Sequence, residues 1–168
     1  MTSATPPSPT QPASPPSPGR VLGIDYGQRR IGIALSDASG TLATPLVTLK
    51  RRPGKRPPVS RILDLARRHR VLRMVVGLPL DLDGCEDSWT VEVRAFGRRL
   101  EERSGLRVHF VDESYSSVEA ESRIRSIGLR RKKKEDKGRI DAGAAAIILQ
   151  DWLDACAVDA SACMDDET

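Results

Sequence analysis

The chain has 168 residues, 39% of them hydrophobic and 30% charged, which suits one globular domain and excludes a chain that is disordered throughout. No apolar run approaches the roughly 18 residues of a membrane span, and the N-terminus lacks the apolar core of a secretory signal. The net charge of +4 is compatible with a polyanionic partner without requiring one. Three widely spaced cysteines match neither a disulfide framework nor a zinc motif, so we expect a cytoplasmic protein with no membrane partner.

Composition divides the chain into three parts. Residues 1–19, "MTSATPPSPTQPASPPSPG", are mainly proline, serine and threonine. They have almost nothing to bury, which predicts a disordered tail. Residues 20–155 carry regular hydrophobic patterns and are expected to form one domain, whereas residues 156–168 are expected to be an acidic, frayed tail.

Three short strands are expected at the start of the domain. Residues 21–24 are apolar and stop at Asp25. In "RRIGIALSD", residues 29–37, bulky side chains alternate with small ones, which predicts a strand with one bulky and one small face. Residues 41–49 form the third strand, and Pro45 places it at a sheet edge because proline cannot donate to a ladder. The short connections predict an antiparallel meander.

Helices and strands then alternate along the chain. The hydrophobic spacing predicts a helix containing residues 59–66, a strand at 72–76, a helix containing 89–100, a strand at 106–110, and helices at 116–127 and 140–155. The small residues at 142–146 would let the last helix lie close to the sheet. A meander followed by this alternation predicts an α/β fold, with a five-stranded mixed sheet and helices on both faces.

Acidic residues end two of the predicted strands and open the last helix. If the first strand is parallel to the two later ones, then Asp25, the loop from Gly77 and the pair 112–113 meet at one edge, where α/β sheets usually bind ligands. Asp141 opens the last helix. Taken singly, these acids suit a turn or a first helical turn. As a set they favour a site for Mg²⁺ or Mn²⁺, which prefer oxygen ligands and relieve repulsion between carboxylates.

Basic residues crowd into two segments, residues 50–73 and 123–139, and the second runs directly into Asp141. Such groups could neutralise the phosphates of a nucleic acid led to a metal site, although most charge runs are simply solvated surfaces. Aromatic residues make up only 4% of the chain, so stacking on unpaired bases is a poor candidate for the main binding mode.

Four segments carry a resemblance to a known family. "GIDYGQRRIGIALSD", "VVGLPLDLDG", "VDESYSSVEA" and "KGRIDAGAAAIIL", in this order and at these spacings, resemble the YqgF family, whose members are called pre-16S rRNA nucleases or RuvX-like Holliday junction resolvases. The match covers about residues 20–154. It implies a ribonuclease H-like fold and divalent-metal-dependent cleavage of phosphodiester bonds.

The resemblance also assigns roles to individual positions. The family's acidic residues fall on Asp25, Glu113 and Asp141, and Asp112 is expected to orient a metal ligand. Its active-site loop falls on Gly77, Leu78 and Pro79. A basic position of the family before the last acid falls on Lys137. The charge of the chain, rather than the resemblance, adds the other basic residues expected to contact nucleic acid: Arg29, Arg131, Lys132, Lys133, Lys134 and Arg139.

Two departures from the family pattern involve three positions. The arginine that commonly follows the acidic pair is Ser114 here, which removes a possible phosphate contact. The usual threonine and lysine after the first glycine are Gln28 and Arg29, which can still form hydrogen bonds.

The function expected from these residues is two-metal hydrolysis of nucleic acid. Asp25 would bridge two Mg²⁺ or Mn²⁺ ions, with Glu113 and Asp141 each holding one. The substrate is expected to be precursor 16S rRNA, trimmed at its 5′ side, or a branched DNA such as a Holliday junction. The sequence leaves this choice open, together with the choice between a monomer and a homodimer.

Two other functions are compatible with parts of the sequence. The first hairpin also resembles the phosphate hairpin of actin-type and sugar-kinase-type ATPases, but those proteins need a second lobe that this chain is too short to supply. A non-catalytic RNA-binding module could keep the same fold. The presence of all three acids argues against that module.

Overall fold

The computed structural model describes residues 19–52, 54–79, 87–112 and 137–162, with the side chains of the last stretch described over 141–157. The elements are β1 (Arg20–Tyr26), β2 (Arg30–Ser36), β3 (Ala43–Lys50), α1 (Val59–Arg68), β4 (Val71–Leu78), α2 (Ser88–Ser104), β5 (Arg107–Asp112) and α4 (Lys137–Ala162). The predicted N-terminal tail and the predicted helix at 116–127 lie outside the described residues.

The strands form one mixed sheet in the order β3-β2-β1-β4-β5. β1 pairs with β2, and β2 with β3, in antiparallel fashion, whereas β1–β4 and β4–β5 are parallel. The predicted meander, the five-stranded mixed sheet and the edge position of the third strand are therefore confirmed. Pro45 lies on that edge strand opposite Ala34, where the register shifts.

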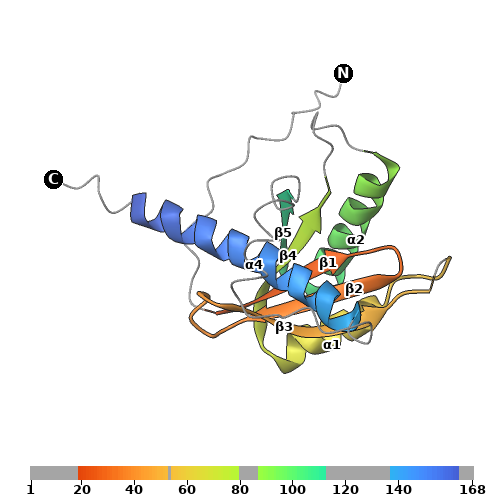
Figure 1. The fold of residues 1–168 in the computed structure, drawn as a ribbon, viewed down its shortest axis with the longest axis horizontal. Helices are drawn as coiled ribbons and strands as arrows, with labels where there is room; N and C mark the ends of the chain where they lie inside the picture. The colour runs from red at the N-terminus through yellow and green to blue at the C-terminus, as the bar shows by residue number, and fades with distance from the viewer. Residues whose placement is uncertain (1–18, 53, 80–86, 113–136, 163–168) are drawn as a thin grey trace, which may run out of the picture.

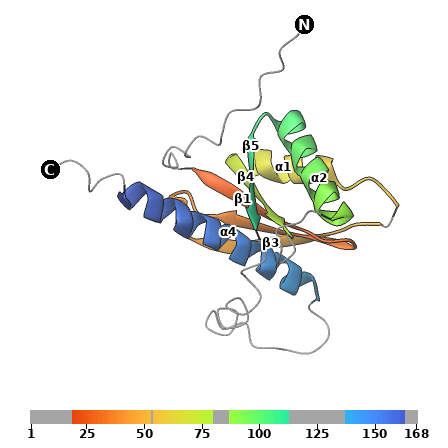
Figure 2. The same ribbon diagram turned by 90° about the horizontal axis from the view of Figure 1, so that it is seen from above.

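Helices cover both faces of the sheet, as predicted. α1 and α2 lie together on one face, and α4 crosses the other face over β1, β2 and β3 (Figures 1 and 2). Asp87 caps the start of α2, where its side chain accepts a hydrogen bond from the backbone of Thr90, and Gly105 caps the end of α2 in a left-handed conformation. α1 begins without a side-chain cap, so its position depends on the burial of its apolar side, including Ile62 and Leu63.

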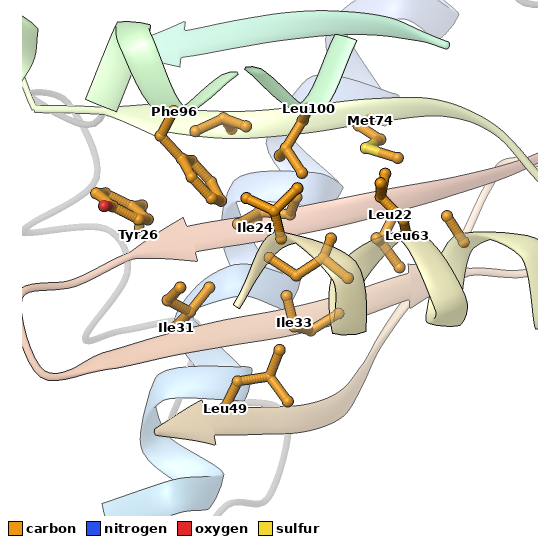
Figure 3. Packing of buried hydrophobic residues seen from close by; sticks show 14 of the residues in the cluster. Leu22, Ile24, Tyr26, Ile31, Ile33, Leu49, Leu63, Met74, Phe96 and Leu100 are labelled. Atoms are coloured by element: carbon orange, nitrogen blue, oxygen red, sulfur yellow. The ribbon is translucent and has the colours of Figure 1, made fainter. Parts of the chain in front are cut away.

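The main core lies between the sheet and the helices α1 and α2 (Figure 3). Every second residue of the first hairpin points into it, including Leu22, Ile24, Ile31 and Ile33, each of which is fully buried. Each such side chain contributes roughly 1.5–3 kcal/mol through the hydrophobic effect. The bulky face predicted from the alternating sequence is thus the face toward α1 and α2.

The opposite face of the hairpin is built from small residues, and α4 packs on it. A methyl group at Gly23 would lie 2.7 Å from Cβ of Leu149, so the backbone of β1 and the side chains of α4 are in direct contact. Ala34 and Ala145 complete this second, smaller core. The close approach predicted for the last helix is confirmed.

α4 is longer than the predicted helix at 140–155. It begins at Lys137 and ends at Ala162, so residues 156–162, expected at the start of a frayed tail, are helical. The reason is local. The segment 155–162, "ACAVDASA", contains four alanines, the best helix former, and nothing that breaks a helix.

Candidate metal centre

The carboxyl ends of the three parallel strands meet at one edge of the sheet. Asp25 is the last residue but one of β1, and Asp112 ends β5 opposite Leu78 of β4. The predicted convergence of these strand ends is therefore confirmed. Gly77 and Leu78, expected in a loop, are instead the last two residues of β4, because they pair with β5; only Pro79 lies beyond the strand.

Asp25 lies on the α4 face of the sheet. Its neighbours Ile24 and Tyr26 belong to the core on the other face, and side chains alternate along a strand. In the antiparallel pairing of β1 with β2, Asp25 stands opposite Gly32. The position beside Asp25 on this face therefore has no side chain, which leaves room for another element.

The beginning of α4 fills that room. A methyl group at Gly32 would lie 1.9 Å from the backbone oxygen of Asp141 and 2.4 Å from its carbonyl carbon. Because Gly32 is the partner of Asp25, this backbone contact brings Asp141 beside Asp25, although 116 positions separate them along the chain. Asp141 is half-buried, with 29% of its side chain exposed.

Burial and the charge of Asp141 perturb Asp25. Burial, as the larger cause, and the negative charge of Asp141 together raise the pKa of Asp25 from 3.8 to about 6. No described cation pairs with Asp25. The arrangement is a carboxylate pair whose repulsion is only partly compensated.

Arg30 supplies that partial compensation. It stands two residues before Gly32 on β2 and donates from Nη1 to Oδ2 of Asp141 over 3.4 Å. Its side chain is 39% exposed, so it can also reach a ligand in solvent. Sequence reasoning missed this residue. The available signal was its i, i+2 spacing from Gly32, which puts it on the small face of the predicted strand.

The end of β4 is fastened to the start of α2. The hydroxyl of Thr90, 1% exposed, lies 2.6 Å from the backbone oxygen of Pro79 and 2.9 Å from Oδ1 of Asp87. The same Asp87 oxygen accepts from the backbone N–H of Thr90 over 2.7 Å. Thr90 was also missed; a sequence signal existed in Asp87, an acidic residue at the helix start.

On the face of the sheet that α1 and α2 cover, the side chain of Tyr26 holds the end of β1 in place. Its ring stacks on Phe96 and Trp89 at centroid distances of 4.1 and 5.5 Å, and the guanidinium of Arg51 lies 4.8 Å from its centre. Its hydroxyl donates to Glu92 over 3.1 Å. Burial, as the main cause, raises the pKa of Tyr26 to about 12. Ring stacking, the guanidinium contact and the hydrogen bond thus fix the position of Tyr26, the residue next to Asp25.

Several predicted site residues cannot be compared with this geometry. Glu113, Ser114 and the basic residues at 131–134 lie outside the described residues. Lys137 and Arg139 lie within the first turn of α4, close to Asp141 in the chain. Arg29 is exposed in the turn between β1 and β2. In the described part of the chain, no three histidine, cysteine or carboxylate side chains gather in one group.

Comparisons with solved structures identify the fold. The solved structure of Thermus thermophilus RuvC in complex with a Holliday junction substrate has a TM-score of 0.55 with 17% identity, over 82% of this chain and 94% of that one. A second structure of the same RuvC gives 0.53 with 18% identity, over 81% and 95%. The fold is therefore that of the ribonuclease H-like nucleases.

Sequence comparison identifies the family. Residues 19–155 match the family model described as "RuvX: Holliday junction resolvase". A protein of Anaeromyxobacter sp. (strain K), named "Putative pre-16S rRNA nuclease", is 45% identical over 135 residues, or 80% of this chain and 96% of its own. One of the same name from Roseiflexus sp. (strain RS-1) is 42% identical over 82% of this chain and 95% of its own. The chain belongs to the RuvX family of nucleases.

Among the helices that the structure describes, none combines the length and the apolar content of a membrane span.

Proposed function

We propose that this chain hydrolyses phosphodiester bonds of nucleic acid at the sheet edge that carries Asp25 and Asp141, with divalent metal ions. The observation that carries the proposal is the backbone contact between Gly32 and Asp141, which sets the two carboxylates side by side. Membership of the RuvX family also supports hydrolysis of phosphodiester bonds. It argues against the two alternatives that the sequence left open, an ATPase of the actin or sugar-kinase type and a non-catalytic RNA-binding module.

The residues at this edge fit Mg²⁺ or Mn²⁺. Both described acids offer carboxylate oxygens, the donors that these ions prefer. The raised pKa of Asp25 indicates a site where negative charge is short of compensation, which a bound cation would supply. Asp25, Asp141 and Glu113 would hold two ions. When bound, the ions lower the pKa of a water molecule for attack on phosphorus and stabilise the leaving oxygen.

The protein's own residues prepare this site. At neutral pH both acids are needed as carboxylates, and the pKa of about 6 at Asp25 allows that state at a cost. Arg30 holds Asp141 in place and adds a positive charge that can meet a substrate phosphate. The Tyr26 stack and the Thr90 contact keep the ends of β1 and β4 fixed, so the carboxylates need not reorganise during the reaction. Asp112 would orient a metal ligand, and the basic residues beside Asp141 would neutralise flanking phosphates.

We assign precursor 16S rRNA as the first candidate substrate, on the names of relatives above 40% identity that match nearly their whole length. The second candidate is a four-way DNA junction, which the description of the matching family model favours. The two differ at the 2′-hydroxyl and in branching, so a direct comparison separates them.

A side-by-side cleavage assay tests the proposal. Labelled precursor 16S rRNA, single-stranded RNA, single-stranded DNA and a four-way junction are each offered to the full chain with Mg²⁺, with Mn²⁺ and with a chelator. Metal-dependent cutting of the precursor at its 5′ side, well above cutting of the other substrates, is the expected result. Cutting of the junction alone would transfer the assignment to the second candidate. Binding of RNA without cleavage under every metal condition would contradict the nuclease proposal.

A further inference from the structure

A cavity lined by arginines lies at the opposite end of the parallel strands from Asp25. A cavity of about 190 Å³ opens where α1 and α2 end and where β4 begins. Its floor is apolar and includes Leu63 and Val71, and three arginines line it: Arg67, Arg70 and Arg103. No carboxylate is among the residues that line it.

Arg70 occupies a backbone conformation that disfavours arginine. Its φ is 53°, and among the described residues it is the one non-glycine residue with a positive φ. It follows α1, and its N–H donates to the backbone oxygen of Arg67 over 3.1 Å. α2 ends in the same conformation, but there the residue is Gly105, with φ 70°. A glycine after α1 would end that helix without strain, so the arginine side chain needs another explanation.

Helix ends alone do not explain the arginine cluster. Arg67 and Arg103 lie in the last turns of their helices, where a positive charge complements the helix dipole. Arg70 lies beyond the helix, at a position where glycine satisfies the same backbone groups. Within the described residues neither Arg70 nor Arg103 forms an ion pair, and the pair of Arg67 with Asp64 is largely exposed to solvent. Among the described residues, no carboxylate therefore neutralises Arg70 or Arg103 over the apolar floor.

We propose that this cavity binds a phosphate group of a nucleic-acid strand, with the attached sugar or base on the apolar floor, as an anchor outside the cleavage site. The identity of the ligand as nucleic acid rests on the proposed function. The strain at Arg70 is retained because its guanidinium completes the phosphate site. Guanidinium groups suit this task because their donors match phosphate oxygens in pairs.

Distance makes the proposal specific. β4 runs from the cavity at Val71 to the proposed metal edge at Leu78. At about 3.3 Å per residue the two sites are at least about 20 Å apart. The cavity also lies on the opposite face of the sheet from Asp25, so a duplex arm must pass around the sheet and extend beyond about six base pairs from the cleaved bond to reach both, given about 3.4 Å per base pair. The affinity for shorter substrates should therefore not depend on the arginines of the cavity.

Binding measurements on full-length chain carrying Asp25→Asn, with a chelator present, test the anchor without cleavage. Fluorescence anisotropy is read for a long and a short version of whichever substrate binds, in backgrounds with Arg70→Gly, Arg103→Ala and, as a matched control, Arg68→Ala. Arg68 is an exposed arginine of the last turn of α1 that does not line the cavity. For the long substrate, we expect Arg70→Gly and Arg103→Ala to weaken binding about five- to tenfold and to lower the salt slope by about one. We expect little change with Arg68→Ala or with the short substrate.

The melting temperature supplies an independent readout. Arg70→Gly should melt at the same or a higher temperature, because it relieves the positive-φ strain while it weakens binding. Equal losses with Arg68→Ala, equal losses for short and long substrates, or unchanged binding would each overturn the anchor. Stabilisation by adenosine monophosphate that requires Arg70, without any effect on strand binding, would overturn the strand in favour of a free nucleotide. Failure of wild-type cleavage would count against the proposed function and leave these binding results standing.

Discussion

Gly32 and Asp141 are in backbone contact: a methyl group at Gly32 would lie 1.9 Å from the carbonyl oxygen of Asp141. Since Gly32 pairs with Asp25 across the first hairpin, this one contact fixes how the start of α4 meets the end of β1. Because Gly32 has no side chain, α4 can approach the sheet closely, and this approach places the Asp141 carboxylate beside Asp25.

Gly32→Ala is therefore expected to disturb both stability and activity. The added methyl group meets backbone atoms, which cannot move aside as a side chain can, so α4 must shift away from the sheet. We expect a loss of about 3 kcal/mol or more in the free energy of unfolding, as for severe overpacking, and loss of cleavage. Urea denaturation measures the first effect. Gly105→Ala is the control: nothing lies within 4 Å of the new methyl, so only the positive φ costs about 1–2 kcal/mol. Equal effects of the two substitutions would contradict the close contact.

Asp25→Asn should stabilise the metal-free protein at high pH. The pKa of Asp25 is raised from 3.8 in the unfolded chain to about 6 in the folded one, so the folded state binds the proton more tightly. Stability then falls as pH rises from about 4 to about 6, and above that range the full penalty of about 3 kcal/mol is present. The substitution removes this penalty. In chelator at pH 8 the free energy of unfolding should rise by up to about 3 kcal/mol, and at pH 4 it should be nearly unchanged.

Two controls sharpen that measurement. Asp154→Asn alters an exposed acid of α4 outside the site, and it should not raise the free energy of unfolding at pH 8. Addition of Mn²⁺ should raise the melting temperature of the wild type and not that of Asp25→Asn, because a ligand stabilises only the state that binds it. A lower free energy of unfolding for Asp25→Asn than for the wild type at pH 8 would contradict the repulsion between Asp25 and Asp141.

Arg30→Gln tests the role of the one described cation that pairs with Asp141. The ion pair is partly exposed, so its loss should change the free energy of unfolding by less than about 1 kcal/mol. Cleavage should fall about tenfold or more, because Asp141 loses its orientation and a substrate phosphate loses a positive charge. Single-turnover kinetics measure this effect, and Arg30→Lys should restore part of it. A large loss of stability with unchanged cleavage would assign Arg30 a purely structural role.

Thr90→Val tests the attachment of the β4 end to α2. The substitution keeps the shape of the side chain but leaves the Pro79 carbonyl without its 2.6 Å hydroxyl contact in a buried place. We expect a loss of about 1–3 kcal/mol in the free energy of unfolding, together with slower cleavage. Thr90→Ser, which keeps the hydroxyl, should lie much closer to the wild type. Full activity of Thr90→Val would show that this attachment does not matter for catalysis.

Periodicity and proline were enough to predict most of the fold. The alternation of bulky and small residues in β2 defined two faces, and Pro45 placed β3 at the edge. The convergence of Asp25 and Asp112 followed from the expectation that strands joined through helices are parallel, so that their carboxyl ends share one edge. The first two rules act within a single segment, and the third needs only the order of helices and strands along the chain.

Individual side-chain contacts between distant segments could not be predicted. Arg30 became part of the site only when α4 was seen to begin on Gly32, a contact across more than 100 residues. Thr90 likewise looks like an ordinary helical residue until the end of β4 reaches it. Gly77 and Leu78 looked like a loop because a glycine and a proline flank the leucine, yet pairing with β5 extends the strand through them.

The central claim is that the carboxylates of Asp25 and Asp141 together support metal-dependent cleavage. The most direct measurement is the single-turnover cleavage rate of the best substrate at saturating Mg²⁺ or Mn²⁺, compared among wild type, Asp25→Asn and Asp141→Asn, with substrate binding measured on the same preparations. The predicted result is a loss of at least about a thousandfold in rate for each variant, with binding within about threefold of the wild type. Cleavage by Asp25→Asn at the wild-type rate would contradict the claim.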